Sequence, residues 1–139
     1  MEEPIDTRYL QRCTDTLEKA LQLLNNAETD SIDYEMYRSA CIKEFEIILE
    51  QSGKLLRKAL KPYFHTPREA DKLVFKDIFR HAALHGLLDL AACERWLAYR
   101  DNRNSTAHDY GEKFAEATLS LLPSFIDDAR ALISIINRF

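Results

Sequence analysis

Apolar residues recur every three or four positions along most of this chain, a pattern typical of helices that bury one face. The first stripe ends at Asn25-Asn26, and its members are Leu10, Cys13, Leu17, Ala20, Leu21 and Leu24. A second helix is predicted from about Asp33 to Lys61, where Pro62 stops it. Ile42 and Ile47 widen its apolar surface beyond one stripe, so we expect a central helix with neighbours on more than one side.

A third helix is predicted from Thr66-Pro67-Arg68-Glu69 to about His85, with Gly86 as its stop. That start combines a capping Thr, Pro at the first helical position and Glu three residues after the cap. A short fourth helix is expected after Asp89. Its inward-facing residues would be Leu90, Cys93, Trp96 and Leu97.

The last segment, 111–139, carries one apolar face and a proline at position 123 that should kink or split the helix. The residues of that face are Phe114, Leu121, Phe125, Leu132 and Ile136. The whole chain contains three Gly and four Pro and has no Asn-Gly or Asp-Gly hairpin dipeptide. We therefore predict an all-α protein, an up-and-down bundle of about five helices, forming a single domain over residues 1–139.

Charge and composition narrow the classes of function. The net charge is −4, which excludes a uniformly basic surface for nucleic acid but leaves room for a local basic site. No apolar run is long enough to span a bilayer and residues 1–10 lack a secretory pattern, so we expect a cytoplasmic protein. Cys13, Cys41 and Cys93 form no CxxC pair and are expected to be buried thiols.

The segment from Arg100 to Tyr110 is dense in polar side chains, and Asn104-Ser105-Thr106 favours a helix end or a strained turn there. Arg103 and His108 would lie about 140° apart on a regular helix, but a break between them could bring them together. Arg suits phosphate oxygens and His can move a proton near neutral pH, so the pair suits phosphodiester cleavage. The alternative is a solvated loop in which His108 caps a helix.

The octet Arg103-Asn104-Ser105-Thr106-Ala107-His108-Asp109-Tyr110 matches the pattern R-N-x-x-x-H-x-Y. This pattern resembles the signature of HEPN domains, specifically the branch of HepT toxins and nucleotidyltransferase substrate-binding proteins. Trp96 and the segment Tyr37 to Glu50, similar to that branch's R-x-x-x-I-x-x-F-E pattern, extend the resemblance over most of the chain.

The resemblance implies a homodimer in which both motifs face one cleft. It implies metal-independent cleavage of RNA, often tRNA, with Arg103 and His108 as catalytic residues and Asn104 and Asp109 as supporting ones. It also implies a minimal nucleotidyltransferase (MNT) antitoxin as partner, which transfers AMP to Tyr110 and silences the toxin. Some family members are nucleotide-binding subunits, so a non-catalytic binding subunit and a purely structural helical dimer remain as alternatives.

Other polar groups carry weaker signals. His81 and His85 are four residues apart but lack the H-E-x-x-H pattern, so a surface or satisfied core pair is favoured. The basic run of Lys54, Arg57, Lys58 and Lys61 is interpreted as a solvated helix end, with an RNA-backbone contact as the alternative. Glu46 and Glu50 share a helix face and are expected at the surface, with a contact to Arg103 as the alternative. No Gly-rich phosphate loop occurs, and we expect no metal or cofactor.

Overall fold

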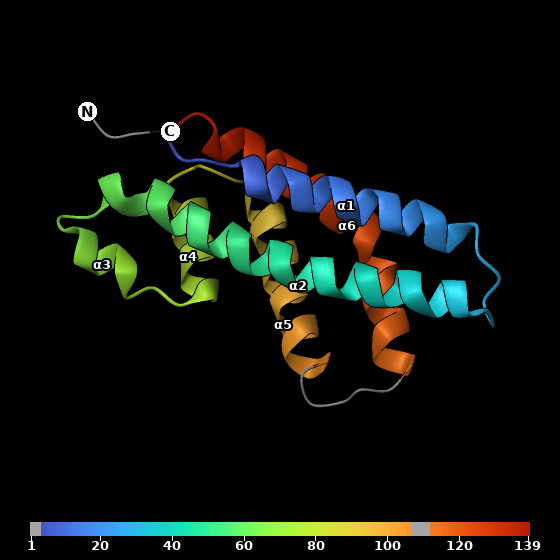
Figure 1. Cartoon of the computed structure of the whole chain (residues 1–139). Helices are drawn as coiled ribbons and strands as arrows, with labels where there is room; N and C mark the ends of the chain where they lie inside the picture. Colours follow the sequence, from blue (N-terminus) through green and yellow to red (C-terminus); the bar gives the residue numbers. More distant parts are fainter. Residues whose placement is uncertain (1–3, 107–111) are drawn as a thin grey trace.

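The computed structural model describes residues 4–106 and 112–139 as a bundle of helices (Figure 1). In chain order these are α1 (Arg8–Asn25), α2 (Ile32–Leu60), the 3-10 turn η1 (Lys61–Tyr63), α3 (Pro67–Asp71), α4 (Phe75–Leu84), α5 (Leu90–Thr106) and α6 (Glu112–Ile136). The described residues contain no strand, and the predicted all-α bundle is confirmed.

Helix α2 is the central element, as its wide apolar surface predicts. It packs against α1, α4 and α6 and also touches the other helical segments around it. Ser31 caps its start, since its hydroxyl accepts a hydrogen bond from the Tyr34 amide at 3.1 Å. Arg57 and Lys58 lie in its last turn, where cations are favoured by the helix dipole. Figure 1 shows α1 lying along α2, with α4 and α5 crossing behind α2 at a steep angle.

Aromatic rings join α2, α4, α5 and α6 in the core. Trp96 of α5 is almost fully buried and stacks on Phe79 of α4 with ring centroids 4.8 Å apart. Phe125 of α6 meets Trp96 edge-on at 5.5 Å and Phe45 of α2 at 4.7 Å. Such rings contribute both buried area and a preferred geometry. Trp96 therefore serves as a packing residue that fixes α5 in the bundle.

A buried polar cluster locks α5 to α6. The Asp128 carboxylate accepts two hydrogen bonds from Arg95, both 2.9 Å long, and one from the Tyr99 hydroxyl at 2.5 Å. Burial, with this bond to a carboxylate, raises the pKa of Tyr99 to about 12. Ser124 lies 2.9 Å from the same hydroxyl. The cluster sets the register of the two helices that lead into and out of the motif segment.

The prediction of one continuous third helix is wrong, because the chain breaks between α3 and α4. Val74 is extended, with φ −81° and ψ 165°. The Leu73 carbonyl bonds the Arg57 guanidinium of α2 at 2.8 Å instead of continuing a helix. The turn lets Phe75 pack against α2 at Gly53, where an added Cβ would lie 2.9 Å from the ring. Thr66 occupies the N-cap position of α3, but its side chain makes no capping bond.

Helix α5 also differs from its prediction, because it is long and continues through Asn104-Ser105-Thr106. Asp89 starts it by accepting a 2.7 Å hydrogen bond from the Ala92 amide. Leu90, expected to face inward, is 69% exposed because it is the first residue of the helix. Cys93 and Trp96 are buried as predicted.

Pro123 lies inside a single helix, α6, rather than between two helices. The helix changes direction along its length in Figure 1. Of the two expected outcomes, a kinked helix or a split one, the kink is therefore confirmed. Its predicted apolar face is buried at Phe125, Leu132 and Ile136, while the side chain of Phe114 lies outside the described residues.

The three cysteines are buried free thiols, as expected. Burial raises the pKa of Cys41 to about 11. Over the described part of the chain, no helix is long and apolar enough to cross a membrane.

Candidate functional site

The motif begins on the last turns of α5. Arg103 and Asn104 lie on this helix, and Asn104 is exposed. His108, Asp109 and Tyr110 lie outside the described residues, so the predicted pairing of Arg103 with His108 stays a prediction. Two sets of contacts hold the helix ends on either side of this segment.

Arg103 lies against α2. Its Nε is 3.8 Å from the Oε2 of Glu46, and the two side chains are 32% and 42% exposed. This distance is that of an ion pair rather than a direct hydrogen bond. The contact between Glu46 and Arg103, expected from the sequence only as an alternative, is therefore the one that forms. It places the guanidinium at the seam between α2 and α5, partly open to solvent.

A second pair repeats this arrangement one helical turn earlier. Arg100 bonds Glu50 at 3.3 Å, and its guanidinium carbon lies 5.0 Å from the centroid of the Phe75 ring. Residues three apart on α5 and four apart on α2 are neighbours along a helix surface. Arg103 and Arg100 therefore form a row of two guanidinium groups along the seam, each beside one carboxylate.

The end of α5 is fixed on two further sides. Asn102 donates a 2.8 Å hydrogen bond to the hydroxyl of Thr118, which is buried on α6. Lys76 of α4 bonds the Asp101 carboxylate at 2.5 Å. Together with the Arg103 pair, these bonds fasten the helix end to α2, α4 and α6. The turn that carries Arg103 is thus set on a rigid element.

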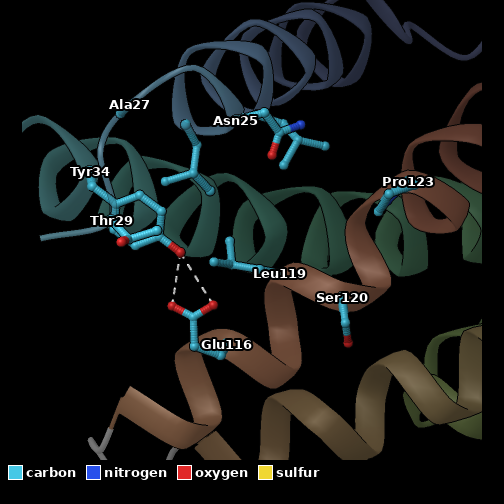
Figure 2. A pocket seen from close by; sticks show the side chains of 10 residues that line it. Asn25, Ala27, Thr29, Tyr34, Glu116, Leu119, Ser120 and Pro123 are labelled. Atoms are coloured by element: carbon cyan, nitrogen blue, oxygen red, sulfur yellow. Dashed lines mark hydrogen bonds between the residues drawn. The ribbon is translucent and has the colours of Figure 1, made fainter.

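The start of α6 is held on the other side of the motif segment. The Tyr34 hydroxyl donates to both carboxylate oxygens of Glu116, at 3.0 and 3.3 Å, and Figure 2 shows the two side chains pointing toward one another. Arg38 pairs with the same carboxylate at 3.3 Å. Burial, followed by the bond to Glu116, raises the pKa of Tyr34.

These contacts border a cavity of about 430 Å³ between the turn from α1 to α2 and the first half of α6 (Figure 2). Asn25 lines it from the end of α1, Thr29 from the turn, and Ser120 and Pro123 from α6. Glu116 also lines this cavity, so it connects the cavity wall to the first turns of α6.

The arrangement can hold an anion beside Arg103. The row of guanidinium groups offers planar donors that match phosphate oxygens, and the carboxylates of Glu46 and Glu50 orient them before a ligand arrives. The neighbouring carboxylates also weaken the local positive potential, so a ligand must compete with them. Among the described residues, Arg103 and Arg100 are thus the groups at this seam with the chemistry to contact a phosphate.

The sequence analysis considered the contact of Glu46 with Arg103 only as an alternative, and it did not predict the other anchoring pairs. A pattern that could have predicted the two ion pairs is the spacing itself: Glu46 and Glu50 are four residues apart, and Arg100 and Arg103 are three apart. The link from Tyr34 to Glu116 joins residues 82 positions apart, and no local pattern indicates it.

The remaining candidate residues from the sequence are the histidines outside the motif, His65, His81 and His85. His85 stacks on Tyr63 with centroids 4.5 Å apart, and His81 meets Phe64 edge-on at 5.2 Å. His85 is exposed, which fits the favoured interpretation of a surface or satisfied core pair. His81 is half-buried, and its Nδ1 is buried without a hydrogen-bond partner among the described residues, so it is not a satisfied core histidine. His65 is exposed.

Comparison with known proteins identifies the family. The family model for proteins described as "Nucleotidyltransferase substrate binding protein like" matches residues 7–138. The chain belongs to this family. A protein of Haemophilus influenzae named "Probable ribonuclease HepT" is 30% identical over 95 residues. That match covers 68% of this chain and 64% of the relative's length. The HepT-like branch expected from the motif is thereby confirmed.

Two solved structures share the fold. One, from Haemophilus influenzae, is described as the fold of a substrate binding domain of a nucleotidyltransferase. It superposes with a TM-score of 0.79 at 24% identity and covers 94% of this chain and 98% of its own. A protein of Thermus thermophilus has a TM-score of 0.64 at 29% identity, over 88% of this chain and 99% of its own.

Proposed function

We propose that this protein is a metal-independent endoribonuclease toxin of a HEPN/MNT toxin–antitoxin pair. The observation that carries the proposal is the placement of Arg103, the first residue of the motif, at the fixed end of α5 and beside Glu46. A relative named as a ribonuclease supports the same activity.

The reaction uses the substrate's own 2′-hydroxyl as nucleophile. His108 removes the hydroxyl proton, the oxygen bonds to phosphorus, and the bond from phosphorus to the 5′-oxygen breaks. A second His108, from the other chain of a homodimer, returns a proton to the departing 5′-oxygen. The products are a 2′,3′-cyclic phosphate and a 5′-hydroxyl. Arg103 pairs with the charge on the phosphate oxygens throughout.

Regulation is proposed to act on Tyr110. An MNT-type nucleotidyltransferase would transfer AMP from ATP to the phenolic oxygen and release pyrophosphate. The added phosphodiester brings a negative charge close to Arg103, where the RNA phosphate binds, and so excludes the substrate. Family membership supports a nucleotidyltransferase as partner.

Incubation of the purified protein with total RNA in EDTA tests the activity. Fragments ending in a 2′,3′-cyclic phosphate are the expected result. RNA that stays intact in EDTA would contradict the proposed metal-independent activity, whether or not the same RNA is cleaved when Mg²⁺ is supplied.

A second candidate is a non-catalytic subunit that binds a nucleotide or presents Tyr110 to a nucleotidyltransferase. The description of the family as substrate binding favours it. Growth arrest on expression of the chain alone separates the two, because only a toxin stops growth without its partner.

A further inference from the structure

A cavity of about 390 Å³ lies between α2, α4 and α5, next to the seam that holds Arg103. Lys54, Arg57 and Arg100 line it, against the single carboxylate of Glu50. The ring of Phe75 forms part of the wall. In a chain of net charge −4, this is a local concentration of positive charge.

The two guanidinium groups in the cavity are held in place. Arg57 donates through Nη2 to the Leu73 carbonyl at 2.8 Å. Its Nε is buried and has no hydrogen-bond partner among the described residues. A buried N–H without a partner costs free energy that an incoming acceptor would recover. Arg100 is fixed by Glu50 and by the face of Phe75.

The structure divides the basic run of α2 into two parts. Lys54 and Arg57 line this cavity, whereas Lys58 and Lys61 line a different one beside residues near both chain ends, including Phe139. Lys61 also lies 4.0 Å from Asp71. The first part of the run is therefore continuous with the row of guanidinium groups on α5, and the second part is not.

We propose that this cavity binds a phosphate of the RNA strand that flanks the phosphate at Arg103. The inference rests on the proposed function, because it takes Arg103 as the contact to the cleaved phosphate. Arg100 lies about 4.5 Å from Arg103 along the axis of α5, given a rise of roughly 1.5 Å per residue. The cations thus continue in one direction from the motif: Arg103, then Arg100, then Lys54 and Arg57.

A strand of RNA presents phosphates at regular intervals, which suits such a row of cations. The phosphates of a free nucleotide offer the same chemistry, but they are clustered and would use the cavity alone. Continuity with Arg103 favours the strand, and the free nucleotide becomes an outcome of the test.

The test measures binding rather than cleavage. The probe is a fluorescent single-stranded hexanucleotide of mixed sequence, methylated at every 2′-oxygen so that it has no nucleophile. The variant is Lys54→Gln, and the matched control is Lys58→Gln, an exposed lysine one turn later on the same helix but outside the cavity. Both substitutions remove one charge from an exposed side chain, so both chains should fold.

Lys54→Gln should weaken hexanucleotide binding about threefold to fivefold, the range of a solvent-exposed ion pair. The slope of log affinity against log salt concentration should fall by about 0.7, as for one lost phosphate contact on a single strand. Lys58→Gln should match the unsubstituted protein in both measurements.

Equal affinities of the two variants would overturn the phosphate site and leave the proposed function standing. Failure of the unsubstituted protein to bind the hexanucleotide would overturn the proposed function itself. A parallel titration with ATP separates the two sources of phosphate. Weaker ATP binding by Lys54→Gln with unchanged RNA binding would overturn the assignment to RNA.

Discussion

At the scale of single residues, Asp128 is a buried carboxylate that depends on its hydrogen-bond donors. It is 8% exposed and accepts hydrogen bonds from Arg95 of α5 and from Tyr99. Removing its charge leaves a guanidinium and a buried hydroxyl with a weaker acceptor. The expected consequence is loss of stability, because the cluster joins α5 to α6 and contains no residue of the motif.

We predict that Asp128→Asn lowers the free energy of unfolding by about 2 kcal/mol, within the range for hydrogen bonds to a charged group. Urea denaturation followed by circular dichroism measures the change. Asp127→Asn is the control, because its neighbour Asp127 is exposed. Equal stability of the two variants would show that the cluster does not fasten α5 to α6.

Tyr110 is the residue on which regulation is proposed to act. After co-expression with an MNT-type nucleotidyltransferase, intact-mass measurement should show one or more additions of roughly 329 Da, the mass of an adenylyl group. Tyr110→Phe should abolish the additions and leave the toxin active beside its partner. An unmodified Tyr110 in a fully neutralised complex would instead indicate inhibition by binding alone.

At the scale of helices, the sequence predicts periodic elements well and turns poorly. The apolar faces of α1 and α2 are predicted correctly, because the spacing of apolar residues indicates which face of a helix is buried. The break before Phe75 is missed because its cause is tertiary: Arg57 takes the Leu73 carbonyl and Gly53 admits the ring. The extension of α5 through Asn104 is likewise set by tertiary contacts, from Asn102 and Arg103, that outweigh weak local helix preference.

In the candidate site too, the sequence predicts residues that are close along the chain better than contacts that form only in the fold. The motif residues are found from sequence because they are close along the chain. Of their anchors, Glu46 is found from sequence only as an alternative contact of Arg103, and Glu116 is not found, because both become neighbours of the motif only through folding.

The pairing of α2 with α5 leads to a prediction about Glu46. Its carboxylate holds Arg103 but also competes with RNA phosphate for the same guanidinium. Glu46→Gln should therefore strengthen binding of a 2′-O-methylated RNA about twofold to threefold, the range of a partly exposed ion pair. Fluorescence anisotropy at low salt measures the change, and Glu69→Gln on α3, which is exposed, is the control. Weaker binding by Glu46→Gln alone would mean that orientation of Arg103 outweighs the competition.

At the scale of the whole molecule, the account depends on a homodimer. One His108 cannot serve easily as both acid and base in a single concerted step. Two chains that bring their motifs to one cleft would supply one histidine for each proton transfer. The oligomer is thus a part of the proposed chemistry as well as of the architecture.

Mixing an inactive chain with the unsubstituted chain tests this arrangement. We predict that a mixed dimer of one unsubstituted chain and one His108→Ala chain, isolated through two different affinity tags, loses most of the RNA cleavage activity. Its cleft holds a single His108, so either the general base or the general acid is missing. Light scattering that shows an active monomer at micromolar concentration would contradict the composite site.

His108 is proposed to cleave RNA without a metal ion. The decisive measurement compares the initial rate of RNA cleavage in EDTA for the unsubstituted protein and for His108→Ala, with circular dichroism to establish that both are folded. We predict a loss of at least about 100-fold in the variant, the lower end of the range for general acid–base catalysis. A folded His108→Ala protein that cleaves at the rate of the unsubstituted protein would contradict this prediction.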